Sequence, residues 1–269
     1  MTDAAVSIHP PTARPSVVGL ILIGLWAAIF IGLSLALLSS ITGDRLDRFG
    51  RLILSGFVTT LRLVATSLVF GAAISVPVAA GRLSRNPILA TLAYSYSYFF
   101  RGTPLIAQTF LIYYGAGQFA LQLRSIGLWW FFRDAYDCAV FAFALNTAAY
   151  QGEILAGAIR AVPGGQREAA QALGLHKLPI LWRIVLPQAL ITALRPYGNE
   201  IVLIIKASAI ASIITVLDLM GETRYVFSQT YDLSFYLWAA VFYLALVEVL
   251  RRASNALERR ITRHLVRAK

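Results

Sequence analysis

Six ionisable side chains lie within long apolar stretches of this chain, where an unpaired charge is costly. They are three acids and three bases, namely Glu153, Glu200, Glu248, Arg62, Arg101 and Lys206. At the centre of a bilayer each costs roughly 2.5–3.5 kcal/mol on insertion scales. Because the two signs are equal in number, every charge has a partner available. We therefore expect these side chains to pair or to line a hydrated path for a solute.

One of the apolar stretches carries polar side chains on a single helical face. Asn146, Tyr150 and Glu153 recur at helical spacing there. An adjacent face of the same helix carries small residues four apart, which are Ala148, Gly152 and Ala156. Small residues let two helix backbones approach closely in a membrane. The pattern predicts a helix that packs tightly on one side and faces a cavity on another.

A later stretch carries a second polar face. Arg195, Asn199 and Lys206 share it, with Glu200 beside it. We predict that this helix and the preceding one line a solute path. The alternative is that Glu153 and Lys206 form a buried ion pair that only fixes the register of the two helices.

The composition places these side chains in an integral membrane protein. The chain is 58% hydrophobic and 14% charged, and its mean hydropathy is +0.68. Residues 15–43 contain no charged side chain, and a span needs roughly 20 residues. That run is too long for the apolar region of a signal peptide, and no cleavage site stands out after it. We expect an all-α protein with about six membrane-spanning helices, at residues 17–40, 52–80, 88–118, 138–160, 194–215 and 235–251.

The third predicted span is too long for one straight crossing at about 1.5 Å per residue. The motif Arg101-Gly102-Thr103-Pro104 interrupts it. We expect residues 88–100 to lie shallow or tilted on the cytoplasmic side and residues 105–117 to finish the crossing.

The basic residues predict that both termini are cytoplasmic, because Lys and Arg are enriched in cytoplasmic loops. With six spans, 15 of the 24 Lys and Arg residues then lie inside: Arg14, Arg82, Arg85, Arg160, Arg167, Lys177, Arg183, Arg195 and the seven from Arg251 to Lys269. Only six lie outside, namely Arg45, Arg48, Arg51, Arg124, Arg133 and Arg224. The net charge of +11 is therefore sided and suits an anionic leaflet rather than a nucleic acid.

A polar segment at residues 161–193 interrupts the membrane spans and predicts a helix-turn-helix at the cytoplasmic surface. Residues 166–173 form a short helix of good helix formers, and Gly174 stands where a left-handed C-terminal cap is needed. Ala169 and Ala170 expose little side chain, so the backbone of a partner has room to approach them. Glu168 is expected near the helix start, where a carboxylate suits the helix dipole.

The second helix of this segment is expected from about Pro179, with a bend at Pro187 after Leu186. A DNA-reading helix-turn-helix with Lys177 and Arg183 is one alternative, which the flanking spans disfavour because they hold the loop at the lipid surface. A purely structural loop is the other alternative.

The sequence carries no motif of an enzyme. Cys138 is the single cysteine, and the three histidines are scattered over two tails and a loop. These residues predict neither a disulfide nor a metal site. No phosphate-binding loop, nucleophile elbow or zinc-binding helix motif occurs, so the chain has no visible means to bind and split ATP. We expect a non-enzymatic subunit that binds no cofactor.

Glu168-Ala169-Ala170, three residues, Gly174, nine residues, Ile184, one residue and Leu186-Pro187 resemble the loop signature of permease subunits of binding-protein-dependent ABC importers. Further segments are similar to the polar amino acid branch, with its histidine, glutamine and opine permeases: Arg101 to Leu105, Asn146 to Tyr150 with Glu153, Ala156 to Pro163, and Asn199-Glu200. The resemblance covers about residues 52–260. Residues 1–50 depart from the histidine-type members, so the first helix is an addition to a five-helix type I core.

This resemblance implies a domain organisation and a set of partners. Residues 1–50 are a tail and extra helix, 51–260 the permease domain, and 261–269 a basic cytoplasmic tail. The helix at Glu168 is then a coupling helix seated on a cytoplasmic ABC ATPase dimer, which uses ATP and Mg. A second permease subunit, identical or related, and a periplasmic amino-acid-binding protein complete an inner-membrane complex.

A secondary amino acid transporter driven by an ion gradient is the alternative function. Glu153, Glu200 and Lys206 would then serve as proton or sodium sites. The sequence shows no convincing inverted repeat or pair of broken helices, which are typical of such carriers.

Overall fold

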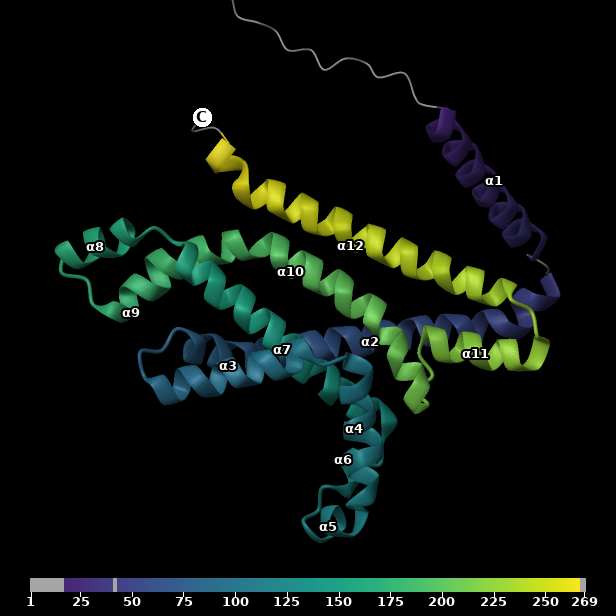
Figure 1. Ribbon diagram of the computed structural model, residues 1–269, viewed down its shortest axis with the longest axis horizontal. Coiled ribbons are helices and arrows are strands. Elements are labelled where there is room, and N and C mark those ends of the chain that lie inside the picture. The colour runs from purple at the N-terminus through teal and green to yellow at the C-terminus, as the bar shows by residue number, and fades with distance from the viewer. Residues whose placement is uncertain (1–16, 41–42, 267–269) are drawn as a thin grey trace, which may run out of the picture.

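The computed structural model describes residues 17–40 and 43–266, and no strand occurs in that part of the chain (Figure 1). The tail before residue 17 and the last three residues of the basic tail lie outside it. The α-helices are α1 (Val17–Ser40), α2 (Gly43–Arg82), α3 (Pro87–Gly102), α4 (Leu105–Gln118), α5 (Ala120–Ser125), α6 (Trp129–Phe132), α7 (Ala135–Ala161), α8 (Gly164–Ala172), α9 (Lys177–Ile180), α10 (Leu186–Ser208), α11 (Leu219–Thr230) and α12 (Ser234–Val266). A π-helical turn, η1 (Leu181–Val185), joins α9 to α10, and a 3-10 helix, η2 (Ala209–Ile214), follows α10.

Four helical stretches in the described residues are long and apolar enough to cross a membrane. They are Val17–Ser40, Asp47–Arg82, Lys177–Ile214 and Ser234–Arg263, and they match four of the six predicted spans. The predicted span 138–160 lies within α7, which is not among the four. Thirteen of the 27 residues of α7 are buried by neighbouring helices. A helix that is shielded from lipid does not need a uniformly apolar surface, so hydropathy underestimates it.

The helix α7 lies at the centre of the fold and packs closely on α2. A Cβ atom added to Gly152 would lie 2.8 Å from the Val78 side chain, so only glycine fits there. Ala148 and Ala156 on the same face are fully buried. The predicted face of small residues is therefore confirmed as a helix-packing surface. The main core forms where α2, α7 and α10 meet, around Phe143 and Ile205.

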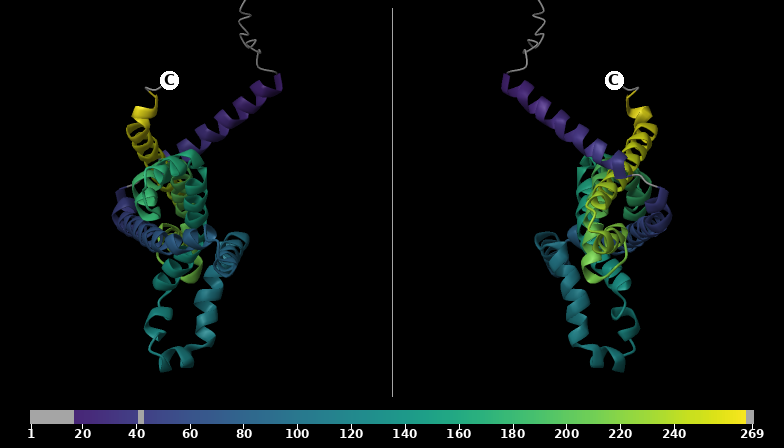
Figure 2. Two further views of the ribbon diagram at one scale, coloured as in Figure 1. Left: turned by 90° about the vertical axis from the view of Figure 1, so that its left-hand side faces the viewer. Right: turned by 90° about the vertical axis from the view of Figure 1, so that its right-hand side faces the viewer.

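The predicted break in the third span is confirmed. Helix α3 ends at Gly102, Thr103 is extended, and α4 begins after Pro104. Proline has no amide hydrogen to continue the α3 ladder, which explains the interruption. Figure 1 shows α4 leaving α3 at a steep angle, and Figure 2 shows α4, α5 and α6 projecting from the bundle as a hairpin. That α4 completes a membrane crossing stays a prediction.

The first two helices differ from expectation in one respect. Helix α2 begins at Gly43 rather than near residue 52, so the expected domain boundary at residue 50 falls inside a helix. Helix α1 leans away from the bundle in Figure 2 and is exposed along almost its whole length. At its end the indole nitrogen of Trp238 in α12 donates a hydrogen bond to the Ser40 hydroxyl (2.8 Å).

Helix α11 is held in a buried corner between α2 and α12. The Asp218 carboxylate caps the helix by accepting from the backbone N–H of Gly221 (2.9 Å). The backbone N–H of Leu219, the first residue of α11, donates to the Thr60 hydroxyl on α2 (3.0 Å). The Asp218 side chain is fully buried. The residue itself lies outside the four candidate membrane spans. Its burial raises the pKa of Asp218 to about 6, although its hydrogen bonds act in the opposite direction.

We expect the stability of this corner to fall as the pH rises. The pKa of Asp218 in the folded chain lies above its ordinary 3.8, so its contribution is complete below pH 3.8 and is lost as the pH rises through about 6. The difference amounts to about 3 kcal/mol. Asp218→Asn keeps a capping oxygen and should flatten the dependence of the melting temperature between pH 4.5 and 7.5. Glu222, whose pKa burial also raises, should leave a smaller slope. An unchanged slope in the variant would contradict the assignment.

Candidate functional site

The predicted cytoplasmic helix-turn-helix is present at one end of the molecule (Figure 1). Gly174 has a φ of +75° and follows α8, in the left-handed conformation that glycine adopts without strain. The N–H of Gly174 donates to the Gln171 carbonyl (2.9 Å) and that of Leu175 to the Ala170 carbonyl (3.1 Å). These two bonds form a complete Schellman cap. The capping role predicted for Gly174 is confirmed.

The two alanines of α8 differ in their surroundings. Ala170 is buried in a small core with Ile180 and Val185, so it fastens α8 to the second helix of the hairpin. Ala169 is exposed and faces outward. Within the hairpin, only Ala169 of the pair is thus available to a partner.

The expected position of Glu168 near the helix start is wrong by about one turn. Helix α8 begins at Gly164, so Glu168 lies beyond the first turn, where the dipole effect has largely decayed. Its side chain is exposed. This exposure makes Glu168 a surface charge of the hairpin rather than a helix-stabilising one.

The second helix of the hairpin continues without a break into the predicted fifth span. The π-helical turn η1 comes directly before Leu186 and Pro187, the first residues of α10. A π turn accommodates the missing amide hydrogen of a proline, and Figure 1 shows the chain changing direction here. The π turn directly before Leu186 and the change of direction between α9 and α10 agree with the bend predicted at Pro187. Helices α9 and α10 are therefore joined through η1 without an interruption.

A pocket of about 360 Å³ lies between the end of α2, the face of α3 and α7. Arg82 and Glu153 form an ion pair across it, with 21% and 18% of their side chains exposed. The Arg82 guanidinium lies 5.1 Å from the centre of the Tyr94 ring. Arg101 also lines the pocket, 5.2 Å from the centre of the Tyr150 ring. Two cations, one anion and exposed aromatic rings thus meet in one place.

Asn146 and Tyr150, the other two members of the predicted polar face of α7, bond to the backbone at the break between α3 and α4. The Asn146 amide donates to the Phe100 carbonyl (2.8 Å) and to the Gln108 side-chain oxygen (3.1 Å). The Tyr150 hydroxyl donates to the Arg101 carbonyl (3.5 Å). These bonds satisfy carbonyl groups that the interrupted helix leaves without partners. Asn146 is 7% exposed and lies behind the pocket rather than in it.

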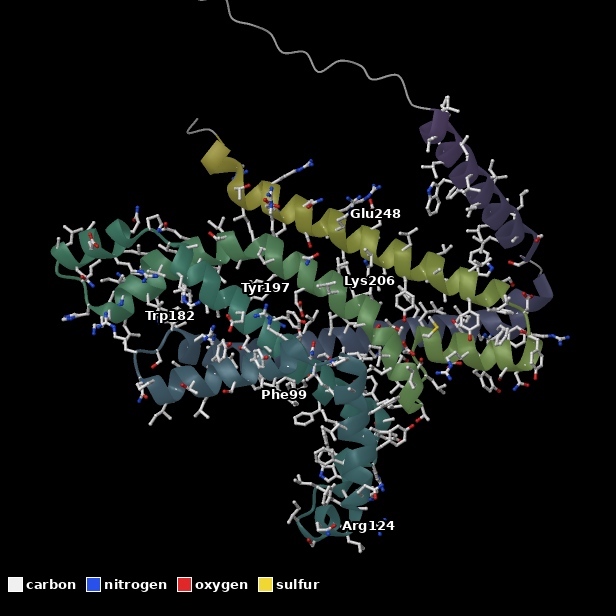
Figure 3. All side chains as sticks on the ribbon, in the orientation of Figure 1. Phe99, Arg124, Trp182, Tyr197, Lys206 and Glu248 are labelled. Carbon is white, nitrogen blue, oxygen red and sulfur yellow. The ribbon has the colours of Figure 1, made fainter. Side chains whose placement is uncertain are left out.

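The six ionisable side chains of the apolar stretches do not pair with one another, which was the first of the two expected arrangements. Within residues 17–40 and 43–266, none of the three acids forms an ion pair with one of the three bases. Glu153 pairs with Arg82, and Glu248 accepts from Arg251 (2.9 Å) and Arg252 (2.7 Å). Lys206 on α10 and Glu248 on α12 are both labelled in Figure 3. Lys206 is exposed, so a buried pair with Glu153 does not form.

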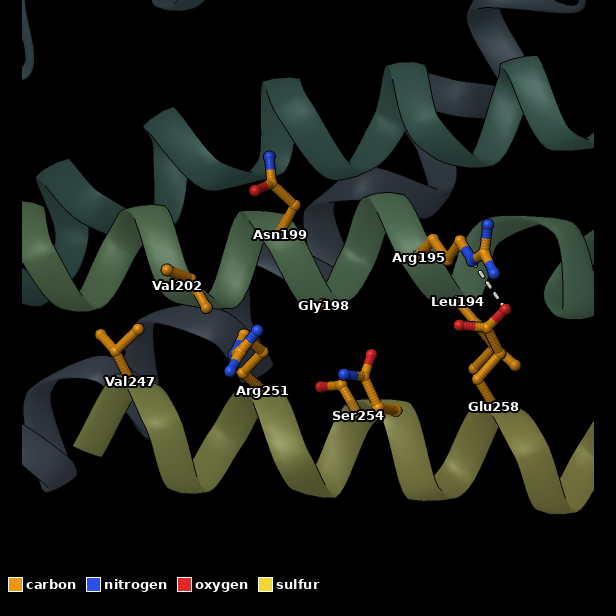
Figure 4. A pocket seen from close by; sticks show the side chains of 10 residues that line it. Leu194, Arg195, Gly198, Asn199, Val202, Val247, Arg251, Ser254 and Glu258 are labelled. Carbon is orange, nitrogen blue, oxygen red and sulfur yellow. Dashed lines mark hydrogen bonds and ion pairs between the residues drawn. The ribbon is translucent and has the colours of Figure 1, made fainter. Parts of the chain in front are cut away.

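Glu200 makes a polar contact between α7 and α10. It is 5% exposed and accepts a hydrogen bond from the Thr147 hydroxyl (2.8 Å). Arg195 and Asn199 instead line a separate pocket together with residues of α12 (Figure 4). The two polar faces expected to line one path therefore face different pockets in the single chain. On α10 it is Glu200, the residue after Asn199, that turns inward to α7.

The sequence pattern placed Arg82 in a cytoplasmic loop and did not indicate a role for Gln108 or Thr147. Arg82 reaches Glu153 because it is the last residue of a 40-residue helix that runs along α7. Gln108 donates to the Phe100 and Thr103 carbonyls (2.9 and 3.1 Å). A glutamine within the apolar stretch after Pro104 was the available signal for this role.

Residues 71–263 match the family model described as "Binding-protein-dependent transport system inner membrane component". The nopaline transport system permease protein NocM of Agrobacterium fabrum is 46% identical over 201 residues, 74% of this chain and 83% of NocM. The arginine ABC transporter permease protein ArtM of Escherichia coli K12 is 35% identical over 208 residues, 77% of this chain and 93% of ArtM.

A likeness to a solved structure accompanies these sequence matches. The crystal structure of an amino acid ABC transporter with histidines aligns with a TM-score of 0.72 and 30% identity. The alignment covers 82% of this chain and 99% of the other. The matched family region 71–263 contains the hairpin and the α2–α3–α7 pocket, whereas α1 lies outside it.

Proposed function

Because the chain belongs to the family of binding-protein-dependent transport system inner membrane components, we propose that it is a permease subunit that imports polar amino acids or opines with an ATP-driven ABC transporter. The observation that carries this proposal is the exposed α8 with its Schellman cap at Gly174, joined through η1 to α10. The relatives transport nopaline and arginine by name, which supports the solute class.

The hairpin transmits movement rather than performing bond chemistry. An ATPase that binds the outward face of α8 pushes on a rigid helix, because Ala170 and its neighbours fasten α8 to α9 and η1. The Arg167 guanidinium donates to the Ile159 carbonyl (2.5 Å), which ties α8 to α7 as well. A displacement of α8 therefore reaches both helices that carry the buried polar residues. Rigid-body gating of this kind exposes a site alternately to the two sides of a membrane.

The solute site is the pocket between α2, α3 and α7. An amino acid carries one carboxylate and one ammonium group, which Arg101 and Glu153 complement in charge. Arg82 holds the Glu153 carboxylate in place, and Tyr94 and Tyr98 offer aromatic faces to the rest of the solute. Glu200 and Asn146 position the helices around this pocket through their buried hydrogen bonds. Lys206, which is exposed on α10, lines the path outside this pocket.

The chain works in a larger complex in the inner membrane. Its partners are a cytoplasmic ABC ATPase dimer that uses ATP and Mg, a second permease subunit and a periplasmic amino-acid-binding protein. Both termini are cytoplasmic, with residues 161–193 facing the ATPase. Helix α1 and the tail before it are an addition to the permease domain.

Co-purification tests this function directly. The full chain, tagged after Lys269, is co-expressed with candidate ATPase subunits and extracted in mild detergent. We expect an ATP-hydrolysing complex, and uptake in vesicles that depends on ATP and survives an uncoupler. A chain that moves solute alone and stops with an uncoupler would make it a secondary carrier instead.

Two adjacent substitutions separate folding of the hairpin from docking. Ala170→Leu overfills the small core under α8 and should destabilise the chain by about 1–3 kcal/mol. Ala169→Leu projects outward, so the melting temperature should stay within about 2 °C of wild type while the ATPase is lost from the complex. The measurements are the melting temperature and the amount of ATPase recovered. Equal effects of the two variants on both measurements would contradict the outward-facing role of Ala169.

A further inference from the structure

A second pocket, of about 340 Å³, lies between α10 and α12 (Figure 4). It shares no residue with the pocket between α2, α3 and α7. Polar residues from both helices line it, namely Arg195, Asn199, Arg251, Ser254 and Asn255. The transport cycle proposed above has no step that needs so many donors at this place.

The pocket is graded from apolar to polar along the two antiparallel helices. Figure 4 shows Val202 and Val247 at one end and the pair Arg195 and Glu258 at the other. Arg195 donates to Glu258 there (2.6 Å). Beyond the pocket, α12 continues with exposed Arg259 and Arg260. Such charges stay out of hydrocarbon, so the polar end of the pocket lies at the membrane surface and the apolar end points into the bilayer.

The polar residues of the pocket offer donors that the chain itself does not use. Within the described part of the chain, the side chains of Ser254 and Asn255 make no hydrogen bond. Arg195 and Arg251 are each engaged by one carboxylate, Glu258 and Glu248 respectively. A guanidinium has five N–H donors, so both arginines keep further donors.

The charge of the pocket suits a singly charged anion. Arg195 and Glu258 line the pocket with Arg251, and Glu248 is shared between Arg251 and Arg252, so the arginines exceed the carboxylates by one. Guanidinium and amide donors are the groups that bind phosphate oxygens in proteins, and basic pockets between membrane helices bind lipid head groups. The valines at the other end suit an acyl chain. We propose that this pocket binds the phosphate group of an anionic phospholipid at the membrane surface.

The test compares two neighbouring arginines in the purified full-length chain. Arg251 lines the pocket, whereas Arg252 bonds to the same Glu248 but does not line it. Binding of phosphatidylglycerol is followed by native mass spectrometry and by the melting temperature, with phosphatidylcholine and inorganic phosphate as comparison probes. We expect Arg251→Gln to weaken phosphatidylglycerol binding about tenfold, the loss of one charge-assisted bond, and Arg252→Gln to change it less than about twofold.

A second variant keeps the proposal testable if Arg251→Gln folds poorly. Asn255→Leu removes a donor and fills the polar end, and it should weaken binding at least about threefold. Equal losses in Arg251→Gln and Arg252→Gln would show diffuse surface attraction and overturn the site. Binding of inorganic phosphate as tight as that of the lipid would overturn the lipid as its source. Equal binding of phosphatidylcholine would overturn the need for an anion.

Discussion

Gly174→Asp is expected to abolish uptake while the protein still reaches the membrane. A Cβ atom added at Gly174 meets nothing within 4 Å in this chain, and the residue is exposed. The substitution therefore causes no clash in the hairpin, and its left-handed φ of +75° costs only about 1–2 kcal/mol. An aspartate would, however, place a buried charge against a docked ATPase. We expect uptake to fall by about 100-fold or more, which corresponds to about 3 kcal/mol.

Gly174→Ala is the matched control for this prediction. Aspartate tolerates the left-handed region better than alanine does, so backbone strain is larger in the alanine variant. If docking is the cause, the alanine variant nevertheless keeps more uptake and more bound ATPase than the aspartate variant. The measurements are uptake, ATPase recovery and the amount of chain in the membrane. Normal uptake in Gly174→Asp, or a larger loss in Gly174→Ala, would refute the docking role.

Glu153→Gln is the second substitution with a large expected effect. It removes the single acid of the pocket and leaves Arg82 without its ion-pair partner. The net positive charge of the pocket therefore increases. We expect uptake to fall by at least about tenfold, because a solute ammonium group loses a charged partner worth about 1.5–3 kcal/mol. The pair is partly exposed, so the loss of stability should be smaller than the 3–5 kcal/mol typical of a fully buried pair. Uptake is measured at matched protein level.

The double variant Arg82→Gln/Glu153→Gln separates a solute site from a structural ion pair. Two glutamines restore a neutral contact between α2 and α7, so the melting temperature should recover towards wild type. Uptake should remain low, because the acid that binds the solute is still missing. Recovery of uptake together with stability would mean that Glu153 only holds the two helices together.

The sequence alone determined the features that depend on neighbouring residues. The hairpin is one of them, because a Schellman cap needs only good helix formers followed by a glycine, as at Gly174. The break after Gly102 is another, since Pro104 removes a backbone donor whatever surrounds it. Four spans followed from the lengths of the apolar runs, because the thickness of a bilayer fixes the length of a helix.

Only the tertiary structure decided which polar groups meet. Glu153 pairs with Arg82, 71 residues away, rather than with Lys206. Asn146 bonds to the Phe100 carbonyl of the broken helix, and Asn199 lines a pocket with residues of α12 rather than of α7. Each of these contacts depends on the rotation and register of whole helices. Close packing at residues such as Gly152 sets that rotation, and a uniformly apolar helix carries too little periodicity to reveal it.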